Sequence, residues 1–149
     1  MSKKTKGDSL GDRMKTFEKV TSDFLMRRTP VIIRLDGKAF HTFTKRINEH
    51  NDPCMFNGPF SEKLHWVMDM TMMQLSANIQ NVKLGYTQSD EISLLLTDWE
   101  KFTTDQWFNG NIQKIVSVSA SMATAYFNYY FQNAFPKAQG LALFDSRVF

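Results

Sequence analysis

The chain contains a short β-branched run, Val31-Ile32-Ile33-Arg34-Leu35, that stops at Asp36-Gly37. A run of this length and composition predicts a strand, and the Asp-Gly pair predicts the turn that ends it. Two further strand candidates span residues 82–87 and 91–97. Only Gln88-Ser89-Asp90 lies between them, so the pair is predicted to form a hairpin.

Apolar residues recur at helical spacing in segments 10–24, 60–79 and 112–132, and the last of these is rich in Ser and Ala. In the first segment they fall roughly on one face, at Met14, Phe17 and Val20. A short helical or turn piece carries Phe40 and Phe43, a loop covers residues 48–53, and residues 141–149 alternate as a strand. Without the first helix, the order is strand, helix, strand, strand, helix, strand. We therefore expect the α+β class, with a ferredoxin-like βαββαβ antiparallel sheet and helices on one face.

In such a sheet the first and third strands are antiparallel neighbours, so the end of one lies beside the start of the other. Asp36 ends the first strand and Asp90 begins the third, so their carboxylates should converge at one edge. Mg²⁺ usually takes one or two carboxylates plus substrate phosphates, and two such ions can clamp a phosphoryl displacement. Gly37 offers a backbone carbonyl and permits close approach. Glu91 should point away from Asp90, as a supporting group.

Each of these motifs also has a plainer interpretation. An Asp-Gly pair after a strand is usually only a turn, and Ser89-Asp90-Glu91 in a hairpin is usually turn chemistry. The aspartate pair at neighbouring strand ends is the stronger signal.

The composition is that of one ordinary globular domain. The chain has 149 residues, a net charge of +3 and a single cysteine, Cys54. The charge permits nucleic-acid binding without arguing for it. One cysteine excludes a disulfide or a cysteine zinc site within the chain, and favours a reducing cytosol. We expect no signal peptide and no membrane span.

Four segments, in order along the chain, resemble motifs of the histidine-tRNA guanylyltransferase family. They are Arg34-Leu35-Asp36-Gly37-Lys38-Ala39-Phe40-His41, Gln88-Ser89-Asp90-Glu91-Ile92-Ser93, Lys114-Ile115-Val116-Ser117 and Phe144-Asp145-Ser146-Arg147-Val148. The opening Leu10-Gly11-Asp12-Arg13-Met14-Lys15 is similar to the bacterial and phage guanylyltransferase-like reverse polymerases. The resemblance covers nearly the whole chain from about Ser9.

The resemblance implies a catalytic palm that adds a nucleotide from GTP or ATP to the 5′ end of tRNA in the 3′–5′ direction. The reaction would serve histidine-tRNA guanylylation or tRNA 5′-end repair, with two Mg²⁺ ions as cofactors. The implied partners are tRNA, nucleoside triphosphates and further copies of the chain, as a dimer or tetramer. The implied location is the cytoplasm of a bacterium or a phage-infected cell.

The resemblance also assigns site residues. Asp36 and Asp90 match the catalytic metal carboxylates, with Gly37 as the backbone metal ligand. The nucleotide-binding positions would be Asp36, Gly37, Lys38, Ala39, Phe40, His41, Ser89 and Asp90. The basic residues that would hold triphosphate or RNA are Arg34, Lys114 and Arg147.

In the family a further helical region follows the palm. We therefore expect a disordered tail over residues 1–9 and a palm over residues 10–149, with the C-terminal part of the family domain absent. Two other functions stay open, namely a nucleotide cyclase-like palm enzyme and a non-catalytic RNA-binding ferredoxin-like module. Modules of the latter kind stack bases on aromatic side chains of the sheet, whereas these strands carry aliphatic residues with acids at their ends, which disfavours that function.

Overall fold

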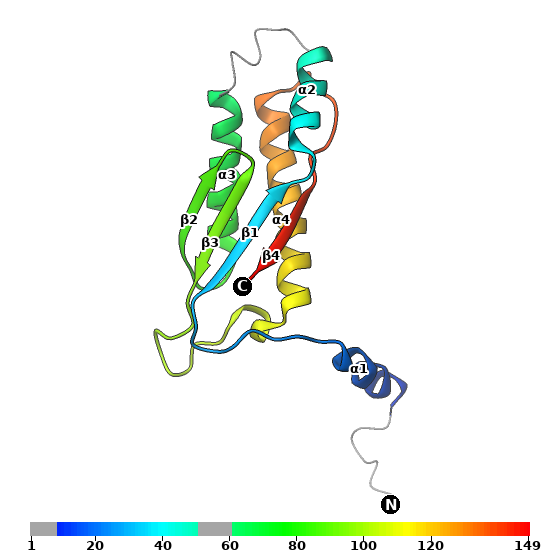
Figure 1. Ribbon diagram of the computed structural model, residues 1–149, viewed down its shortest axis with the longest axis vertical. Coiled ribbons are helices and arrows are strands. Elements are labelled where there is room, and N and C mark those ends of the chain that lie inside the picture. The colour runs from blue at the N-terminus through cyan, green and yellow to red at the C-terminus, as the bar shows by residue number, and fades with distance from the viewer. Residues whose placement is uncertain (1–8, 51–60) are drawn as a thin grey trace, which may run out of the picture.

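The computed structural model describes residues 9–50 and 61–149. Its elements, in chain order, are α1 Leu10–Val20, β1 Val31–Gly37, α2 Phe40–His50, α3 Glu62–Asn78, β2 Val82–Gln88, β3 Glu91–Leu96, the 3₁₀ turn η2 Trp107–Gly110, α4 Ile112–Ala134 and β4 Phe144–Val148 (Figure 1). The predicted tail, except its last residue, and part of the predicted loop 48–53 lie outside the described residues.

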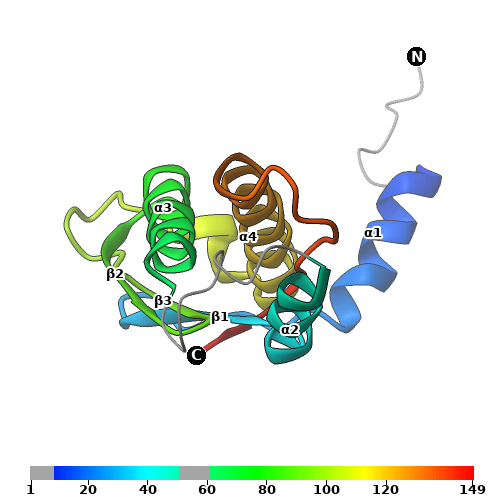
Figure 2. The ribbon, with the colours of Figure 1, turned by 90° about the horizontal axis from the view of Figure 1, so that it is seen from above.

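The four strands form one sheet in the order β2-β3-β1-β4, and every neighbouring pair is antiparallel. This order confirms the predicted ferredoxin-like arrangement, with β1 and β3 side by side in the middle. Helices α3 and α4 lie next to each other on one face of the sheet (Figure 2). The catalytic candidates must therefore be sought on the other face or at the strand ends.

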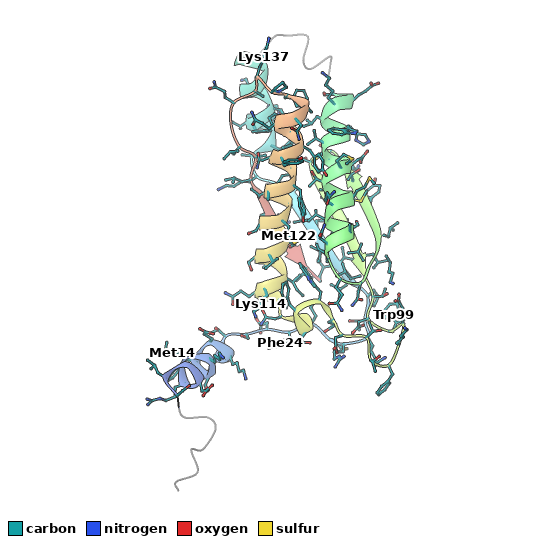
Figure 3. The ribbon with its side chains drawn as sticks, turned by 180° about the vertical axis from the view of Figure 1, so that it is seen from behind. Met14, Phe24, Trp99, Lys114, Met122 and Lys137 are labelled. Atoms are coloured by element: carbon teal, nitrogen blue, oxygen red, sulfur yellow. The ribbon has the colours of Figure 1, made fainter. Side chains whose placement is uncertain are left out.

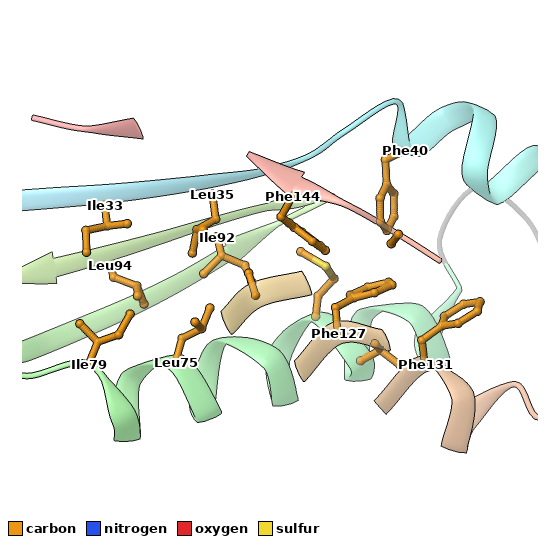
Figure 4. Packing of buried hydrophobic residues seen from close by; sticks show 14 of the residues in the cluster. Ile33, Leu35, Phe40, Leu75, Ile79, Ile92, Leu94, Phe127, Phe131 and Phe144 are labelled. Carbon is orange, nitrogen blue, oxygen red and sulfur yellow. The ribbon is translucent and has the colours of Figure 1, made fainter. Parts of the chain in front are cut away.

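The core lies between the sheet and these two helices, because alternate strand residues point toward them. Ile33 and Leu35 of β1 are fully buried and pack with residues from both helices, including Leu75 and Phe127 (Figure 4). Small residues let the Ser- and Ala-rich helix α4 lie close to the sheet, since Ser119 is fully buried and shares a hydrogen bond of 2.8 Å with Ser146 of β4.

Several boundaries differ from the prediction, for example the end of α2 at His50 and the start of β4 at Phe144, and two of the differences matter most here. Strand β1 continues through Asp36 and Gly37, because β4 pairs with both of them. Helix α1 ends at Val20 and projects from the body of the molecule (Figure 3), so its apolar stripe is exposed. Across the part of the chain that the structure describes, none of the helices combines the length and the apolar character needed to cross a membrane.

Candidate active site

Asp36 and Asp90 come together at the edge where β1 ends and β3 begins. The amide of Gly37 donates a hydrogen bond of 3.1 Å to the carbonyl oxygen of Asp90, which ties the hairpin turn to the end of β1. The turn itself consists of Ser89 and Asp90, and Ser89 has a left-handed backbone with φ of 56°. The Ser89 hydroxyl donates to Oδ1 of Asp90 at 3.1 Å. The structure thus brings together two carboxylates that are far apart in sequence.

The sheet face opposite the helices carries its side chains in three rows that run across all four strands. Strand pairing defines the rows, because residues paired across antiparallel strands project from the same face. The row nearest the edge that carries Asp36, which we call the carboxylate edge, is the acidic row Gln88, Glu91, Asp36 and Asp145. The next row inward is the cationic row Tyr86, Ser93, Arg34 and Arg147. The third is the apolar row Leu84, Leu95, Ile32 and Phe149. Two guanidinium groups therefore lie directly beside the acidic row.

Ion pairs join the acidic and cationic rows. Nε of Arg34 lies 2.9 Å from Oε1 of Glu91, and its guanidinium also lies over the ring of Phe149. Arg147 makes longer contacts, 3.9 Å to Oδ2 of Asp36 and 3.8 Å to Oδ1 of Asp145. These side chains are partly exposed, so each pair contributes little to stability.

The carboxyl group of Asp36 is partly buried and lies near three other carboxyl groups. Burial raises its pKa above the ordinary value, and the neighbouring charges of Asp90, Asp145 and Glu91 raise it further. The positive charge of Arg147 acts in the opposite direction and lowers it. The net effect is a raised pKa, to which burial contributes most and the three acidic neighbours contribute further.

The predicted cradle after Asp36 is a tight turn into α2. Gly37 is required there because the ring of Phe40 packs over it, and a Cβ at Gly37 would lie 2.5 Å from that ring. Phe40 is a buried core residue in contact with Phe127 and Phe144, so its side chain faces the interior and only its backbone lies at the turn. The Lys38 amide is also used inside the fold, since it donates to the carbonyl of Leu143 at 2.8 Å.

The other predicted site residues form two groups, one close to the aspartate pair and one distant from it. Lys38, Ala39 and His41 are exposed beside the carboxylate edge. Lys114 lies in the first turn of α4, toward the other end of the molecule (Figure 3). Thr124 of the same helix bonds the amide of Phe144, which pairs with Gly37, and Lys114 is about 15 Å from that level along the helix axis. The structure does not bring Lys114 to the aspartate pair.

The residues at this edge fit a magnesium ion by their chemistry. Among the described residues, no three His, Cys, Asp or Glu side chains form a ready metal-binding group. One or two carboxylates are nevertheless the usual protein share of a Mg²⁺ site, which is completed by water and phosphate oxygens. The raised pKa of Asp36 is an observation of the same kind, because part of the rise comes from repulsion by Asp90, Asp145 and Glu91, which a bound divalent cation would relieve.

Asp145 is the residue at this edge that sequence reasoning did not single out. It lies directly across from Asp36 in the β1–β4 pair, and its charge helps to raise the pKa of Asp36. Local pattern gives no sign of this neighbour. The pairing register of the last strand with the first would have been needed to find it.

An acidic edge beside a cationic row, on the open face of a ferredoxin-like sheet, is the arrangement of a palm-type domain. The model of the tRNAHis guanylyltransferase (Thg1) family matches residues 11–149. The chain therefore belongs to this family.

Solved structures and curated sequences agree with that assignment. A bacterial tRNAHis guanylyltransferase-like protein in complex with GTP superposes with a TM-score of 0.83 at 46% identity, over 95% of this chain and 63% of that chain. The ATP complex of such a bacterial protein gives 0.81 at 46% identity, over 95% of this chain and 58% of that chain. The tRNAHis guanylyltransferase of Debaryomyces hansenii is 30% identical over 91% of this chain and 47% of its own length. The chain thus spans about half the length of the curated relatives it matches.

Proposed function

We propose that this chain carries the Mg²⁺-dependent catalytic palm of an enzyme that adds a nucleotide to the 5′ end of tRNA in the 3′–5′ direction. The observation that carries the proposal is the aspartate pair, which the bond from the Gly37 amide to the Asp90 carbonyl holds at one edge. Family membership supports the reaction, and the GTP and ATP complexes of bacterial relatives support nucleoside triphosphates as substrates.

Asp36, Asp90 and the carbonyl of Gly37 would hold the metal. When bound, magnesium supplies positive charge against the phosphate oxygens and lowers the pKa of an attacking hydroxyl. Asp36 must be ionised to bind it, so its raised pKa makes metal binding more sensitive to acid than an ordinary aspartate would be.

The chain's own cations would hold the triphosphate. Arg147 contacts Asp36 and Asp145 only at long range, so its guanidinium can turn to a phosphate with little loss. Arg34 would either leave Glu91 for a phosphate oxygen or bind Glu91 and the phosphate at the same time. Guanidinium groups suit this work because they donate two parallel hydrogen bonds to a phosphate. The turn into α2 adds the exposed side chains of Lys38 and His41.

The reaction that these groups would support is an in-line phosphoryl transfer. The 3′-hydroxyl oxygen of the bound nucleoside triphosphate forms a bond to the activated 5′ phosphorus of the RNA. The anhydride bond at that phosphorus breaks, and AMP or pyrophosphate leaves. The residues act by positioning and by compensating charge, which is the protein's main contribution in transfers of this class.

The decisive experiment uses radiolabelled GTP or ATP, a tRNA with a 5′-triphosphate or an adenylylated 5′ end, and the protein with or without Mg²⁺. We expect tRNA that is one nucleotide longer at its 5′ end, and we expect no product from Asp36→Ala or Asp90→Ala. The matched control is Asp105→Ala, which removes an exposed carboxylate at the other end of the sheet. Full activity of both site variants would overturn the metal assignment.

The same assay separates the two alternatives. Cyclic nucleotide formed from the triphosphate without RNA would replace the proposal with a cyclase. RNA binding that persists without Mg²⁺ and in both site variants, with no product of either kind, would replace it with a non-catalytic RNA-binding module.

A further inference from the structure

Tyr86, on the edge strand β2, stands on the open face of the sheet close to the carboxylate edge. The residues on either side of it, Gly85 and Thr87, face α3 instead. The Thr87 hydroxyl donates to Oδ1 of Asp69 on α3 at 2.6 Å, and a Cβ at Gly85 would collide with the sulfur of Met72 on the same helix. Because side chains alternate along a strand, the ring of Tyr86 must point away from the helices.

The ring of Tyr86 is an uncovered aromatic surface. The residue is 57% exposed, and its hydroxyl donates to Oε1 of Gln88 at 3.4 Å, which directs the ring toward the carboxylate edge. Among the described residues no cation lies over this ring, whereas the ring of Phe149, on the same face, lies under the guanidinium of Arg34. One exposed apolar residue is normal on a protein surface, so the surroundings of Tyr86 decide whether it binds a ligand.

The surroundings of Tyr86 suit a nucleotide. Its row continues across the sheet through the short Ser93 to the guanidinium groups of Arg34 and Arg147. Neighbouring strands are about 4.8 Å apart, so the ring and the first guanidinium arise from backbones about 10 Å apart with only a serine between them. A planar base can therefore lie against the ring while cations stay close to its phosphate. Exposed aromatic side chains on the sheets of RNA-binding proteins stack bases in this way.

A protein partner suits this face less well than a nucleic acid. The centres of protein–protein interfaces are depleted of charged residues, yet two of the three rows on this face are the acidic row and the cationic row. An RNA strand alternates phosphates with bases, and guanidinium groups beside an aromatic ring match that alternation.

The position of Tyr86 indicates which nucleotide it would hold. Strands β2 and β4 form opposite edges of the sheet (Figure 1). The cations proposed to hold the triphosphate, Arg147, Arg34 and Lys38, lie on β4, on β1 and in the turn after β1. The nucleoside triphosphate would occupy that side, which leaves the β2 side to the second reactant, the end of the RNA.

We propose that Tyr86 binds the 5′ end of the RNA by stacking on the base of its first nucleotide. Tyr86 lies two residues from Gln88 of the acidic row, or about 7 Å along the strand, which is within the reach of one nucleotide. A base held on the ring would therefore place its own 5′ phosphorus at the carboxylate edge. Stacking needs no hydrogen bond to the base, so Tyr86 would accept any first nucleotide. This inference rests on the proposed nucleotidyl transfer and names the group that positions its second substrate.

A tRNA that carries the fluorescent base 2-aminopurine in its first nucleotide tests the stacking. The sample contains Mg²⁺ and no nucleoside triphosphate, so binding is observed without nucleotide addition. We expect a saturable change in fluorescence with wild type and with Tyr86→Phe, and the loss of most of that change with Tyr86→Ala. Tyr129→Ala removes a tyrosine of α4 that is 65% exposed on the helical side of the molecule, and as the matched control it should behave as wild type. A change of the same size in Tyr86→Ala would overturn the proposal.

A tRNA whose first nucleotide lacks a base tests the same contact by affinity. Removal of the base should weaken binding to wild type about fivefold or more, as for a lost stack of a base on an aromatic ring. It should weaken binding to Tyr86→Ala no further, because the partner of the base is already gone. Equal losses in the two proteins, or no loss in wild type, would overturn the proposal. If Tyr86→Ala does not fold, the comparison of the two tRNAs on wild type decides.

The inference and the proposed function fail in different ways. A fluorescence change that depends on Tyr86, without any nucleotide addition, would overturn the proposed reaction and support the contact with RNA. Nucleotide addition with the same KM for tRNA in wild type and Tyr86→Ala would support the reaction and overturn the contact. No binding of tRNA to wild type would overturn both.

Discussion

The tight turn at the end of β1 leads us to expect that Gly37→Ala destabilises the protein. A Cβ at Gly37 would lie 2.5 Å from Cδ2 of Phe40, 3.0 Å from its Cγ and 3.2 Å from its Cβ. The ring cannot retreat easily, because its centroid lies 5.4 Å from that of Phe43, 5.5 Å from that of Phe127 and 6.2 Å from that of Phe144. The substitution must therefore shift a core side chain or the backbone of the turn.

The magnitude follows from two opposing effects. Forcing an extra carbon into a packed site costs about 1–3 kcal/mol. Replacing glycine by alanine restricts the unfolded chain and returns about 0.4–1 kcal/mol. We expect Gly37→Ala to lower the free energy of unfolding by about 1–2 kcal/mol. Because the Gly37 amide holds the carbonyl of Asp90, nucleotide binding should weaken as well.

Urea denaturation of four proteins tests the reasoning: wild type, Gly37→Ala, Phe40→Leu and the double variant. The smaller leucine makes room for the new methyl group, so the double variant should be more stable than the sum of the single effects predicts, by about 0.5 kcal/mol or more. Gly11→Ala is the matched control, since its Cβ would come no nearer than 3.8 Å to Ser9. Additive effects, or a Gly37→Ala protein as stable as wild type, would refute the packing argument.

Three further predictions follow from the same edge and its supports. The raised pKa of Asp36 means that its ionised form destabilises the folded state. The free energy of unfolding should therefore fall as the pH rises from 3.8, the ordinary pKa of an aspartate, through the raised pKa of Asp36. Asp36→Asn should therefore be more stable than wild type at neutral pH, and the difference should vanish below that ordinary value in urea denaturation at several pH values. Asn128→Asp removes donors to two backbone carbonyls, one of them that of Ala142, and should cost about 1–3 kcal/mol while speeding hydrogen exchange in the segment before β4. Arg147→Gln should raise the KM for the nucleoside triphosphate about tenfold with little change in kcat, whereas Arg27→Gln, which removes an exposed cation paired with an aspartate, should change neither.

Much of the fold could be predicted because its signals are local. The β-branched run at Val31, the short link between two strands and the helical periodicities each predict one element, and their order admits the ferredoxin-like sheet. The end of β1 could not be predicted in this way. Asp36 and Gly37 belong to the strand because they pair with Asp145 and Phe144 at the far end of the chain.

Other features depend on contacts that no local pattern contains. The stripe of Met14, Phe17 and Val20 predicts a helix with these residues roughly on one face, and the helix forms, yet it projects from the body and the stripe is exposed. Asp98 and Gln106 lie around an irregular loop, and only the folded chain buries both of these polar side chains. Periodicity predicts which elements form, whereas it does not predict what an irregular segment packs against.

The charge balance at the carboxylate edge links stability to the proposed chemistry. Asp36, Asp90, Asp145 and Glu91 gather there, and among the described residues they face the guanidinium groups of two arginines, which leave negative charge in excess. Burial and that excess together raise the pKa of Asp36 and make its ionised form unfavourable for the fold. A divalent cation would relieve the repulsion among these carboxylates. The same repulsion therefore lowers the stability of the metal-free protein and strengthens its binding of the metal. Neutralising Asp145 should therefore stabilise the protein without metal and weaken its affinity for Mg²⁺, a pair of opposite changes that a purely structural role for this residue would not produce.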